Sequence, residues 1–280
     1  MTRKLLAFLT IGGAVLSAET RILVHGHRGA RAVRPESTLA GFEYAIAAGA
    51  DVLEMDLAVT RDNVLVVSHD PVLEPKICRG PGPSAVIREM TLEQLQRWDC
   101  GSLRNPDYPR QQLVPGARVP TLDEVLALAP RGGFGFNIET KIFRDRPRYT
   151  PSPEEFARLL AEAIARHRLG QRVIVQSFDF RTLHAMKKLM PQVRLAALYE
   201  RGSRDFVSVA GEAGARIISP NYRLVTEQNV KAAHEAGLEV VPWTANTAGQ
   251  WDRLIDAAVD AIITDDPAEL IQYLKQRGKR

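Results

Sequence analysis

Short apolar runs rich in Val, Ile and Leu alternate with longer amphipathic segments along nearly the whole chain. Such runs are typical of buried strands, whereas apolar residues spaced three and four apart are typical of helices. The pattern predicts eight strands, over Ile22–His27, Val52–Val59, Phe134–Glu139, Arg172–Gln176, Val193–Leu198, Arg216–Ser219, Leu238–Trp243 and Ala261–Thr264. It also predicts eight helices, over Glu36–Ala48, Leu122–Leu128, Pro153–His167, Asp179–Leu189, Asp205–Ala213, Thr226–Ala236, Thr247–Ala257 and Pro267–Gln276.

This alternation of strand and helix determines the expected fold class. Strands separated by helices favour a parallel sheet, because each helix carries the chain back to the start of the next strand. Eight such units in about 250 residues fit a closed (β/α)8 TIM barrel. An open, doubly wound parallel sheet is the alternative. We therefore expect one α/β domain, a TIM barrel, over residues 19–280.

One stretch interrupts the alternation. Residues 72–120 are rich in loop signals, with Pro-Gly turns and a single short predicted helix over Thr91–Trp98. A loop of this length is uncommon in a compact domain unless it has a function. We therefore expect an insertion after the second strand, lying over the mouth of the barrel.

The N-terminus has the pattern of a secretory signal peptide. Arg3 and Lys4 form a short basic region, and the apolar run Leu5–Leu16 follows it. The small residues Ser17 and Ala18 then provide a cleavage site, after Ala18 or, alternatively, after Ser17. The run is shorter than the roughly 20 apolar residues that a membrane-spanning helix needs. We expect a signal peptide over residues 1–18 and a periplasmic or secreted enzyme; an N-terminal helix packed on the domain is the alternative.

Export would change what the two cysteines can do. Cys78 and Cys100 both lie in the insertion. An oxidising compartment would allow them to form a disulfide. Two free, partly buried thiols are the alternative, and the spacing resembles no zinc site.

Charge and composition exclude some partners. Hydrophobic residues make up 45% and charged residues 25% of the 280 positions, as is ordinary for a globular protein. Without Arg3 and Lys4 of the leader, the net charge of +4 falls to +2. A nucleic-acid-binding protein usually carries a dense basic patch, so we expect no nucleic acid partner. We also expect no stable membrane insertion, and the composition does not indicate an oligomeric state.

Functional side chains gather at the predicted strand ends, where TIM barrels place their active sites. Glu54 and Asp56 lie two apart in a strand, so both point to the same face. The rest of that face is apolar, and two carboxylates there are costly unless they are paired or bind a cation. The other strand-end residues of this kind are His27, Arg28, His69, Asp70, Glu139, Lys141, Gln176 and Trp243.

Glu54, Asp56 and Glu139 form a candidate metal site. Three carboxylates without a cysteine or a tight histidine cluster suit a hard cation such as Ca²⁺ or Mg²⁺. The cation would offset the mutual repulsion of the carboxylates and neutralise charge on a phosphoryl oxygen. The alternative is that Glu54 and Asp56 pair with Arg28 and bind no metal.

Two basic residues and two histidines complete the candidate site. Arg28 and Lys141 supply fixed positive charge for a phosphate, Arg28 through its planar guanidinium. His27 and His69 are placed for proton transfer near neutral pH. With the carboxylates, they indicate attack at a phosphorus centre with acid–base assistance. A structural hydrogen-bonding role is the alternative for each histidine.

These motifs resemble those of the glycerophosphodiester phosphodiesterase family. The central matches are His27-Arg28, Glu54-x-Asp56 and His69-Asp70-Pro71. Arg34-Pro35-Glu36-Ser37-Thr38 is similar to the Pro-Glu-Asn-Thr helix start of that family, with Ser37 in place of Asn. Later matches are Asn137-Ile138-Glu139-Thr140-Lys141, Gln176-Ser177-Phe178-Asp179 and Trp243-Thr244-Ala245-Asn246. Each motif is short, but their order along eight predicted strands, from His25 to about Pro267, is specific.

The resemblance implies a reaction and a role for each residue. A glycerophosphodiester would be hydrolysed to an alcohol and glycerol 3-phosphate. In the family, a neighbouring glycerol hydroxyl attacks phosphorus, and water then opens the resulting cyclic phosphate. The implied roles are divalent-metal ligation by Glu54, Asp56 and Glu139, acid–base catalysis by His27 and His69, and substrate contact by Arg28, Lys141, Gln176, Phe178 and Trp243.

Other functions remain open at this point. A lysophospholipase D or sphingomyelinase-like phosphodiesterase would use the same site on lipid headgroups, but it would need a wide apolar mouth. The insertion is mostly polar and contains arginines, which favours small water-soluble diesters. A non-catalytic binding barrel would be favoured by loss of a histidine or a carboxylate, and none is lost. Phe178 and Trp243 either line the substrate site or belong to the core.

Several further residues receive expectations of their own. His25 points the same way as His27 but deeper in the barrel, so we expect a structural role. Asp265, at the end of the last strand, is expected to cap the helix that follows. His167, His184 and His234 fall on predicted helices and are assigned no role.

The loop after the third predicted strand, residues 142–151, carries alternating arginines at Arg144, Arg146 and Arg148. Strand-end loops of a TIM barrel overhang the active site. These side chains therefore either attract an anionic diester or form an ordinary solvated loop.

Overall fold

The computed structural model describes residues 21–81 and 85–280. The predicted signal peptide, residues 1–18, lies outside the described residues. Within the described residues, no helix is both long and apolar enough to span a membrane.

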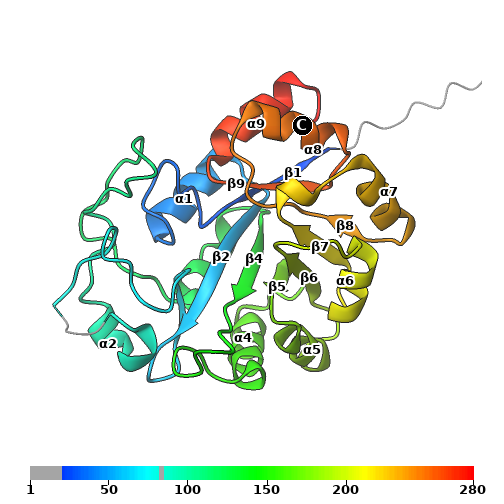
Figure 1. Ribbon diagram of the computed structural model, residues 1–280. Helices are drawn as coiled ribbons and strands as arrows, with labels where there is room; N and C mark the ends of the chain where they lie inside the picture. Colours follow the sequence, from blue (N-terminus) through cyan, green and yellow to red (C-terminus); the bar gives the residue numbers. More distant parts are fainter. Residues whose placement is uncertain (1–20, 82–84) are drawn as a thin grey trace, which may run out of the picture.

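Eight parallel strands form the barrel (Figure 1). From β1 to β8, each barrel strand pairs with the next one along the chain, and β9 pairs with β1. The ring closes through backbone hydrogen bonds from Asp260 N–H to Val240 O (3.1 Å) and from Ile263 N–H to Pro242 O (3.0 Å). The TIM barrel prediction is therefore confirmed. The strands are β1 (Leu23–Gly26), β2 (Val52–Val59), β4 (Gly135–Thr140), β5 (Val173–Ser177), β6 (Arg194–Tyr199), β7 (Ile217–Pro220), β8 (Glu239–Val240) and β9 (Ala261–Thr264).

Two strands differ from the predicted pattern. A strand outside the eight predicted ones, β3 (Leu65–Val67), folds back antiparallel onto the end of β2. Strand β8 is regular only over Glu239–Val240, although six residues were predicted. Pro242 interrupts it because proline has no N–H to donate to a neighbouring strand.

The helices surround the sheet, and side-chain caps define their starts. They are α1 (Leu39–Ala48), α3 (Leu122–Leu126), α4 (Pro153–His167), α5 (Phe180–Leu189), α6 (Phe206–Ala213), α7 (Glu227–Glu235), α8 (Ala248–Asp256) and α9 (Pro267–Gln276). Short 3₁₀ turns are η1 (Ile87–Glu89), η2 (Ala129–Arg131) and η3 (Tyr222–Leu224).

The starts of two helices correct the sequence-based expectation. Helix α1 begins at Leu39 rather than Glu36, with Thr38 as its N-cap. Ser37 has a φ of 56°, which is incompatible with a helix, so the turn before the cap cannot be helical. The cap of α9 is Asp266, whose side chain accepts from Glu269 N–H. The expectation that Asp265 caps this helix is wrong.

Two apolar layers stabilise the barrel. The larger lies between the sheet and the surrounding helices and includes the fully buried Phe42, Phe136 and Phe156. The smaller lies inside the barrel and includes Ile174 and Ile263. Burial of this kind is the dominant favourable term in folding, so the strand ends are held on a rigid scaffold.

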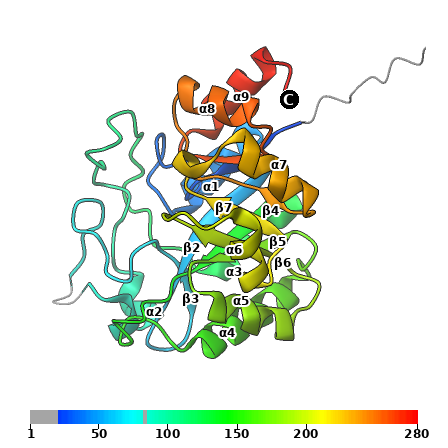
Figure 2. The ribbon, with the colours of Figure 1, turned by 45° about the vertical axis from the view of Figure 1, so that its right-hand side comes forward.

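The insertion packs beside the mouth of the barrel, next to β2 and α1 (Figures 1 and 2). It has a small core of its own, in which Leu73, Leu95 and Trp98 pack on Ala58 and Val66 of the β2–β3 hairpin. Among its described residues, the one α-helix is α2 (Leu92–Leu95), which is shorter than the predicted Thr91–Trp98.

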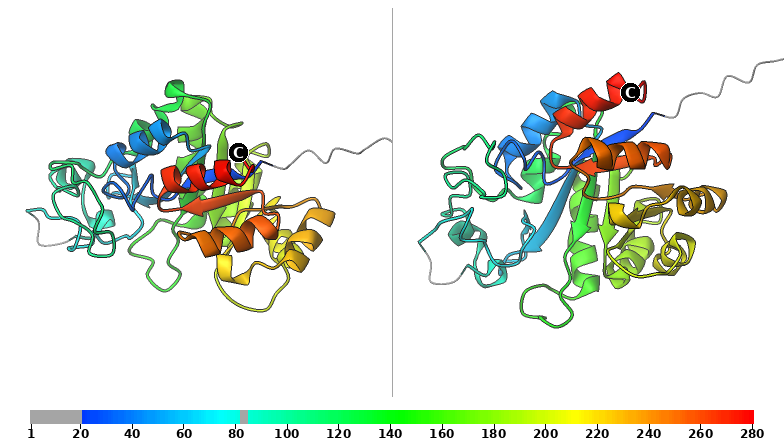
Figure 3. Two further views of the ribbon diagram at one scale, coloured as in Figure 1. Left: turned by 90° about the horizontal axis from the view of Figure 1, so that it is seen from above. Right: turned by 45° about the horizontal axis from the view of Figure 1, so that its top comes forward.

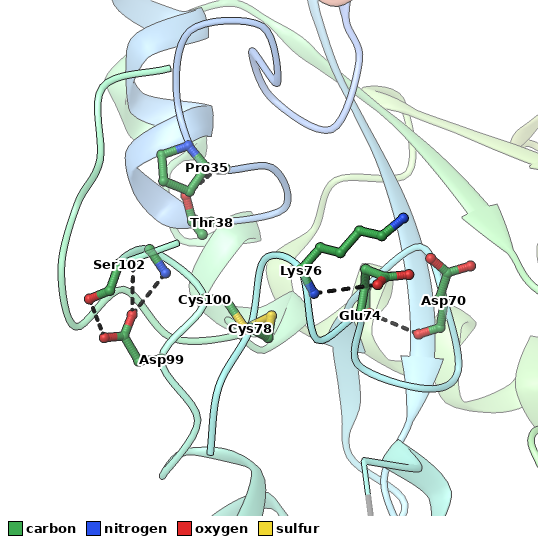
Figure 4. The surroundings of a disulfide bond; sticks show 11 residues. Pro35, Thr38, Asp70, Glu74, Lys76, Cys78, Asp99, Cys100 and Ser102 are labelled. Atoms are coloured by element: carbon green, nitrogen blue, oxygen red, sulfur yellow. Dashed lines mark hydrogen bonds between the residues drawn. A yellow bond between two sulfur atoms is a disulfide. The ribbon is translucent and has the colours of Figure 1, made fainter. Parts of the chain in front are cut away.

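A disulfide between Cys78 and Cys100 joins two loop segments of this insertion, close to the turn that precedes α1 (Figure 4). Both cysteines are buried, at 6% exposure. The disulfide expectation is therefore confirmed, and the free-thiol alternative is excluded.

Candidate active site

A cavity of about 390 Å³ opens at the carboxyl ends of the strands. All ten residues predicted to act in the site line this cavity. They are His27, Arg28, Glu54, Asp56, His69, Glu139, Lys141, Gln176, Phe178 and Trp243. The remaining lining residues include Arg31, Leu198 and Glu200.

Three buried carboxylates lie at the bottom of the cavity. Glu54 and Asp56 occupy alternate positions of β2, and Asp56 lies in register with Glu139 of β4. One oxygen from each of the three lies within 4.8 Å of the others. Their exposed fractions are 2%, 1% and 5%. Three carboxylates this close together and this well shielded from solvent would repel one another strongly without compensating positive charge.

Lys141 and Arg28 supply part of that compensation. Lys141 Nζ lies 2.8 Å from Glu139 Oε1 and 3.1 Å from Asp56 Oδ1. Arg28 Nε is 3.5 Å from Asp56 Oδ2, and the Arg28 backbone N–H donates to Glu54 Oε2 at 2.9 Å. Both basic residues therefore lie directly at the carboxylates.

The pKa values show that the compensation is incomplete. Burial, together with the charge of Asp56, raises the pKa of Glu139 to about 8 despite the neighbouring Lys141. Burial and Asp56 also raise the pKa of Glu54 well above its usual value. For Asp56, burial is outweighed by Lys141, His69 and Arg28, and the pKa is lowered.

The residues fit a hard divalent cation. When all three are ionised, Glu54, Asp56 and Glu139 carry one more negative charge than Arg28 and Lys141 can balance. Asp56 Oδ2 is buried and has no hydrogen-bond partner among the described residues. An all-oxygen set of carboxylates is the ligand type that Ca²⁺ and Mg²⁺ prefer.

His27 follows β1 and is held from behind by a buried carboxylate. Its Nδ1 lies 2.5 Å from Asp265 Oδ1, and its Nε2 lies 4.0 Å from Glu54 Oε2. Burial lowers the pKa of His27, although Asp265 opposes this effect. Asp265 therefore orients the ring so that Nε2 faces the cavity, a role that the sequence pattern did not indicate.

His69 reaches the cavity from the turn after β3. Its Nδ1 lies 3.1 Å from Asp70 Oδ1, and its side chain is more exposed than that of His27 (33% against 12%). The two histidines thus enter from different strands, each with one carboxylate beside its Nδ1. This arrangement leaves Nε2 of each ring available for proton transfer.

Two aromatic side chains form the outer wall. Phe178 and Trp243 meet edge to face, with ring centroids 5.7 Å apart. Trp243 Nε1–H donates to Ser219 O at 2.8 Å, which fixes the indole. Phe178 is 45% exposed, so it does not belong to the core. Both rings line the cavity, as expected of residues that contact a substrate.

Two polar residues that support the site were not predicted to do so. Glu36, just before α1, accepts from Arg28 Nη1 (2.7 Å) and from Arg31 Nη2 (2.9 Å). Asn137 donates to Gln176 Oε1 at 3.0 Å, and Gln176 in turn donates to Glu54 Oε1 at 2.9 Å. The motifs contained both residues, but spacing alone did not reveal their partners.

The other histidines lie where expected. His25 is 1% exposed and lies 3.4 Å from Asn137 Nδ2, below the site. Burial lowers its pKa to about 3, so it is neutral and structural. The partners of His167, His184 and His234 are surface groups on other elements, and none of these three histidines lines the cavity.

Comparisons with known proteins place this site in a family. Residues 27–269 match the model of the glycerophosphoryl diester phosphodiesterase family. A glycerophosphodiester phosphodiesterase from Caldanaerobacter subterraneus is 33% identical, over 92% of this chain and 100% of its own length. One from Bacillus subtilis is 32% identical, over 91% of this chain and 87% of its own.

Solved structures share the fold. A protein from Silicibacter pomeroyi DSS-3 superposes with a TM-score of 0.85 at 30% identity, covering 92% of this chain and 95% of its own. An Oleispira antarctica phosphodiesterase, solved with the product sn-glycerol-3-phosphate, has a TM-score of 0.78 at 23% identity, covering 91% and 97%. From the family match and the identity to its relatives, this chain belongs to the glycerophosphoryl diester phosphodiesterase family.

Proposed function

We propose that this phosphoric diester hydrolase cleaves small glycerophosphodiesters to an alcohol and glycerol 3-phosphate, with a divalent cation and two histidines. One observation carries the proposal: three carboxylates, two basic side chains and two histidines converge on a single strand-end cavity. The names of the relatives and the glycerol phosphate product bound to the Oleispira antarctica enzyme support a substrate of this class.

Glu54, Asp56 and Glu139 would hold the cation, which supplies positive charge beside a phosphoryl oxygen when it is bound. Arg28 and Lys141 border the same carboxylates and would bind the remaining phosphate oxygens. Arg28 is itself oriented by Glu36, so its guanidinium is already in place before a substrate arrives. Such preorganised charge favours the transition state without further rearrangement.

His27 would act as the general base. Asp265 accepts the Nδ1–H of His27, so Nε2 is left to remove the proton of the attacking glycerol hydroxyl. His69 would then donate a proton to the oxygen of the leaving alcohol. The product of this first step is a cyclic phosphate. In the second step the roles reverse, and water opens the ring to give glycerol 3-phosphate.

Phe178 and Trp243 would contact the organic part of the substrate. A lysolipid would present its acyl chain to the same wall. A panel of glycerophosphodiesters and lysolipids therefore separates the proposed activity from a lysophospholipase D. Higher kcat/KM for a lysolipid than for any water-soluble diester would contradict the proposed substrate class.

The mechanism is tested by removing the metal and then each histidine. We expect EDTA to abolish activity and readdition of Ca²⁺ or Mg²⁺ to restore it, and we expect Glu139→Ala to lose activity as well. His27→Ala and His69→Ala should each lower kcat by roughly 10²–10⁴-fold. His184→Ala, a surface histidine, is the matched control. Full activity in a metal-free preparation would refute the mechanism.

We also propose that the enzyme is exported, as the leader over residues 1–18 predicts. The Cys78–Cys100 disulfide supports this proposal, because structural disulfides persist mainly in oxidising compartments. N-terminal sequencing of protein isolated from the periplasm tests it. A mature protein that retains Arg3 and Lys4 would refute cleavage.

A further inference from the structure

The Asp265 carboxylate behind His27 is held by two donors. Asn246 Nδ2 donates to Asp265 Oδ2 at 2.6 Å, and the hydroxyl of Tyr108 donates to the same oxygen at 2.8 Å. The other oxygen, Oδ1, is the one that contacts His27. Tyr108 belongs to the insertion and lies 157 residues from Asp265 in sequence.

The donor and acceptor roles in this chain of contacts follow from chemistry. Burial alone would raise the pKa of Asp265, but His27, Arg31 and Tyr108 lower it to about 2. The pKa of Tyr108 is raised, by burial and by the charge of Asp265. The carboxylate is therefore ionised and only accepts, while the phenol stays protonated and donates. His27 must therefore carry a proton on Nδ1, which it donates to Oδ1 of Asp265.

Neighbouring contacts fix Tyr108 in place. The guanidinium of Arg31 lies over its ring, with Cζ 4.7 Å from the centroid. On one side of Tyr108, the buried Asn105 donates to Glu36 Oε2 at 3.1 Å. On the other side, the buried Gln111 donates to Arg31 O at 2.6 Å. The segment around Tyr108 is thus docked on the loop between β1 and α1.

We propose that Tyr108 is a positioning residue, through which the insertion holds Asp265 against His27 and so fixes the ring for catalysis. This inference rests on the proposed role of His27 as general base. Without the Tyr108 hydroxyl, Oδ2 of Asp265 keeps Asn246 as its one side-chain donor, so the carboxylate can rotate and His27 Nε2 would spend less time in the reactive orientation. Positioning of this kind contributes to kcat rather than to substrate affinity.

The test removes only the hydroxyl. In Tyr108→Phe the ring keeps its contact with Arg31, and Asp265 loses one donor. We expect kcat on sn-glycero-3-phosphocholine to fall about 10-fold, equivalent to about 1.4 kcal/mol, while KM stays within about twofold. Tyr273→Phe is the matched control, because Tyr273 donates at 2.7 Å to the Asp252 carboxylate, away from the cavity. It should leave kcat unchanged.

A double-mutant cycle separates positioning from a general structural role. If Tyr108 acts through His27, Tyr108→Phe should have little further effect in the His27→Ala background. In the His69→Ala background it should still lower kcat about 10-fold. Thermal melting of each full-length variant checks that all of them are folded.

Two results would overturn the inference. One is a kcat of Tyr108→Phe close to that of the wild type. The other is an equal loss in the His27→Ala and His69→Ala backgrounds, which would show that the hydroxyl does not act through His27. Failure of the proposed function has a different signature, since His27→Ala itself would then keep wild-type turnover.

Discussion

Removing the disulfide should destabilise the insertion by an amount that the length of the closed loop predicts. Cys78 and Cys100 are 22 residues apart. On the chain-entropy model, cross-linking a loop of that length lowers the entropy of the unfolded chain by about 11 cal/mol/K, or about 3 kcal/mol at 25 °C. We therefore expect Cys78→Ala/Cys100→Ala to lower the free energy of unfolding of the insertion by about 3 kcal/mol.

The structure provides a reporter for this measurement. Trp98 is 7% exposed and packs in the small core of the insertion, whereas Trp251 is 2% exposed and packs in the main core. Urea denaturation followed by the fluorescence of Trp98, in a Trp243→Phe/Trp251→Phe background, reports on the insertion. Far-UV circular dichroism reports on the barrel helices in the same samples.

Reductant provides the control. Dithiothreitol added during denaturation should shift the midpoint of the oxidised protein towards that of the double variant, and it should not affect the double variant itself. Both sulfurs are buried, so reduction without denaturant should be slow. A double variant within about 1 kcal/mol of the oxidised protein would refute the loop-entropy argument.

Two further predictions concern exposed and strained positions. Replacing Arg144, Arg146 and Arg148 with Gln should lower kcat/KM at low ionic strength if these side chains attract substrate, and the defect should shrink with salt. Arg144 is paired with Asp179 at 3.0 Å, so its contribution should be the smallest; an unchanged kcat/KM at low salt would exclude steering. Ser37→Asn should raise the melting temperature by about 2 °C, because asparagine tolerates the left-handed φ of 56° better than serine. A lower melting temperature would show that the site cannot accommodate the larger side chain.

The residues of the cavity could be predicted because they lie in or directly after predicted strands, on the side of the barrel where those strands end. In a parallel barrel the strand ends meet at one rim, so Glu54, Asp56 and Glu139 had to converge once the strands were identified. Alternation along β2 then decided which side chains face inward. The periodic pattern was therefore enough to predict both the fold and the residues at the centre of the site.

The supporting role of Asp265 could not be predicted because His27 and Tyr108, which it contacts, are remote in sequence. Asp265 was assigned to a helix cap, since an Asp before a helix that begins with proline is typical of one. Its partners include His27 and Tyr108, which are 238 and 157 residues away. Hydrophobic periodicity gives no relation between Tyr108, in a loop of the insertion, and Asp265, at the end of the last strand. Only the closed barrel brings them together.

The pairing of β1 with β9 makes closure of the barrel depend on a strand that leaves the ribosome long after the first. Strand β1 lies in register with β9, and the backbone N–H of Ile22 donates to Lys279 O at 3.1 Å, so the start of β1 adjoins the end of α9 (Figure 3). Contacts of such long sequence separation close late, because the loop-closure entropy must be overcome first. A nascent chain that has not yet released residues 261–265 therefore lacks both a closed barrel and the carboxylate behind His27.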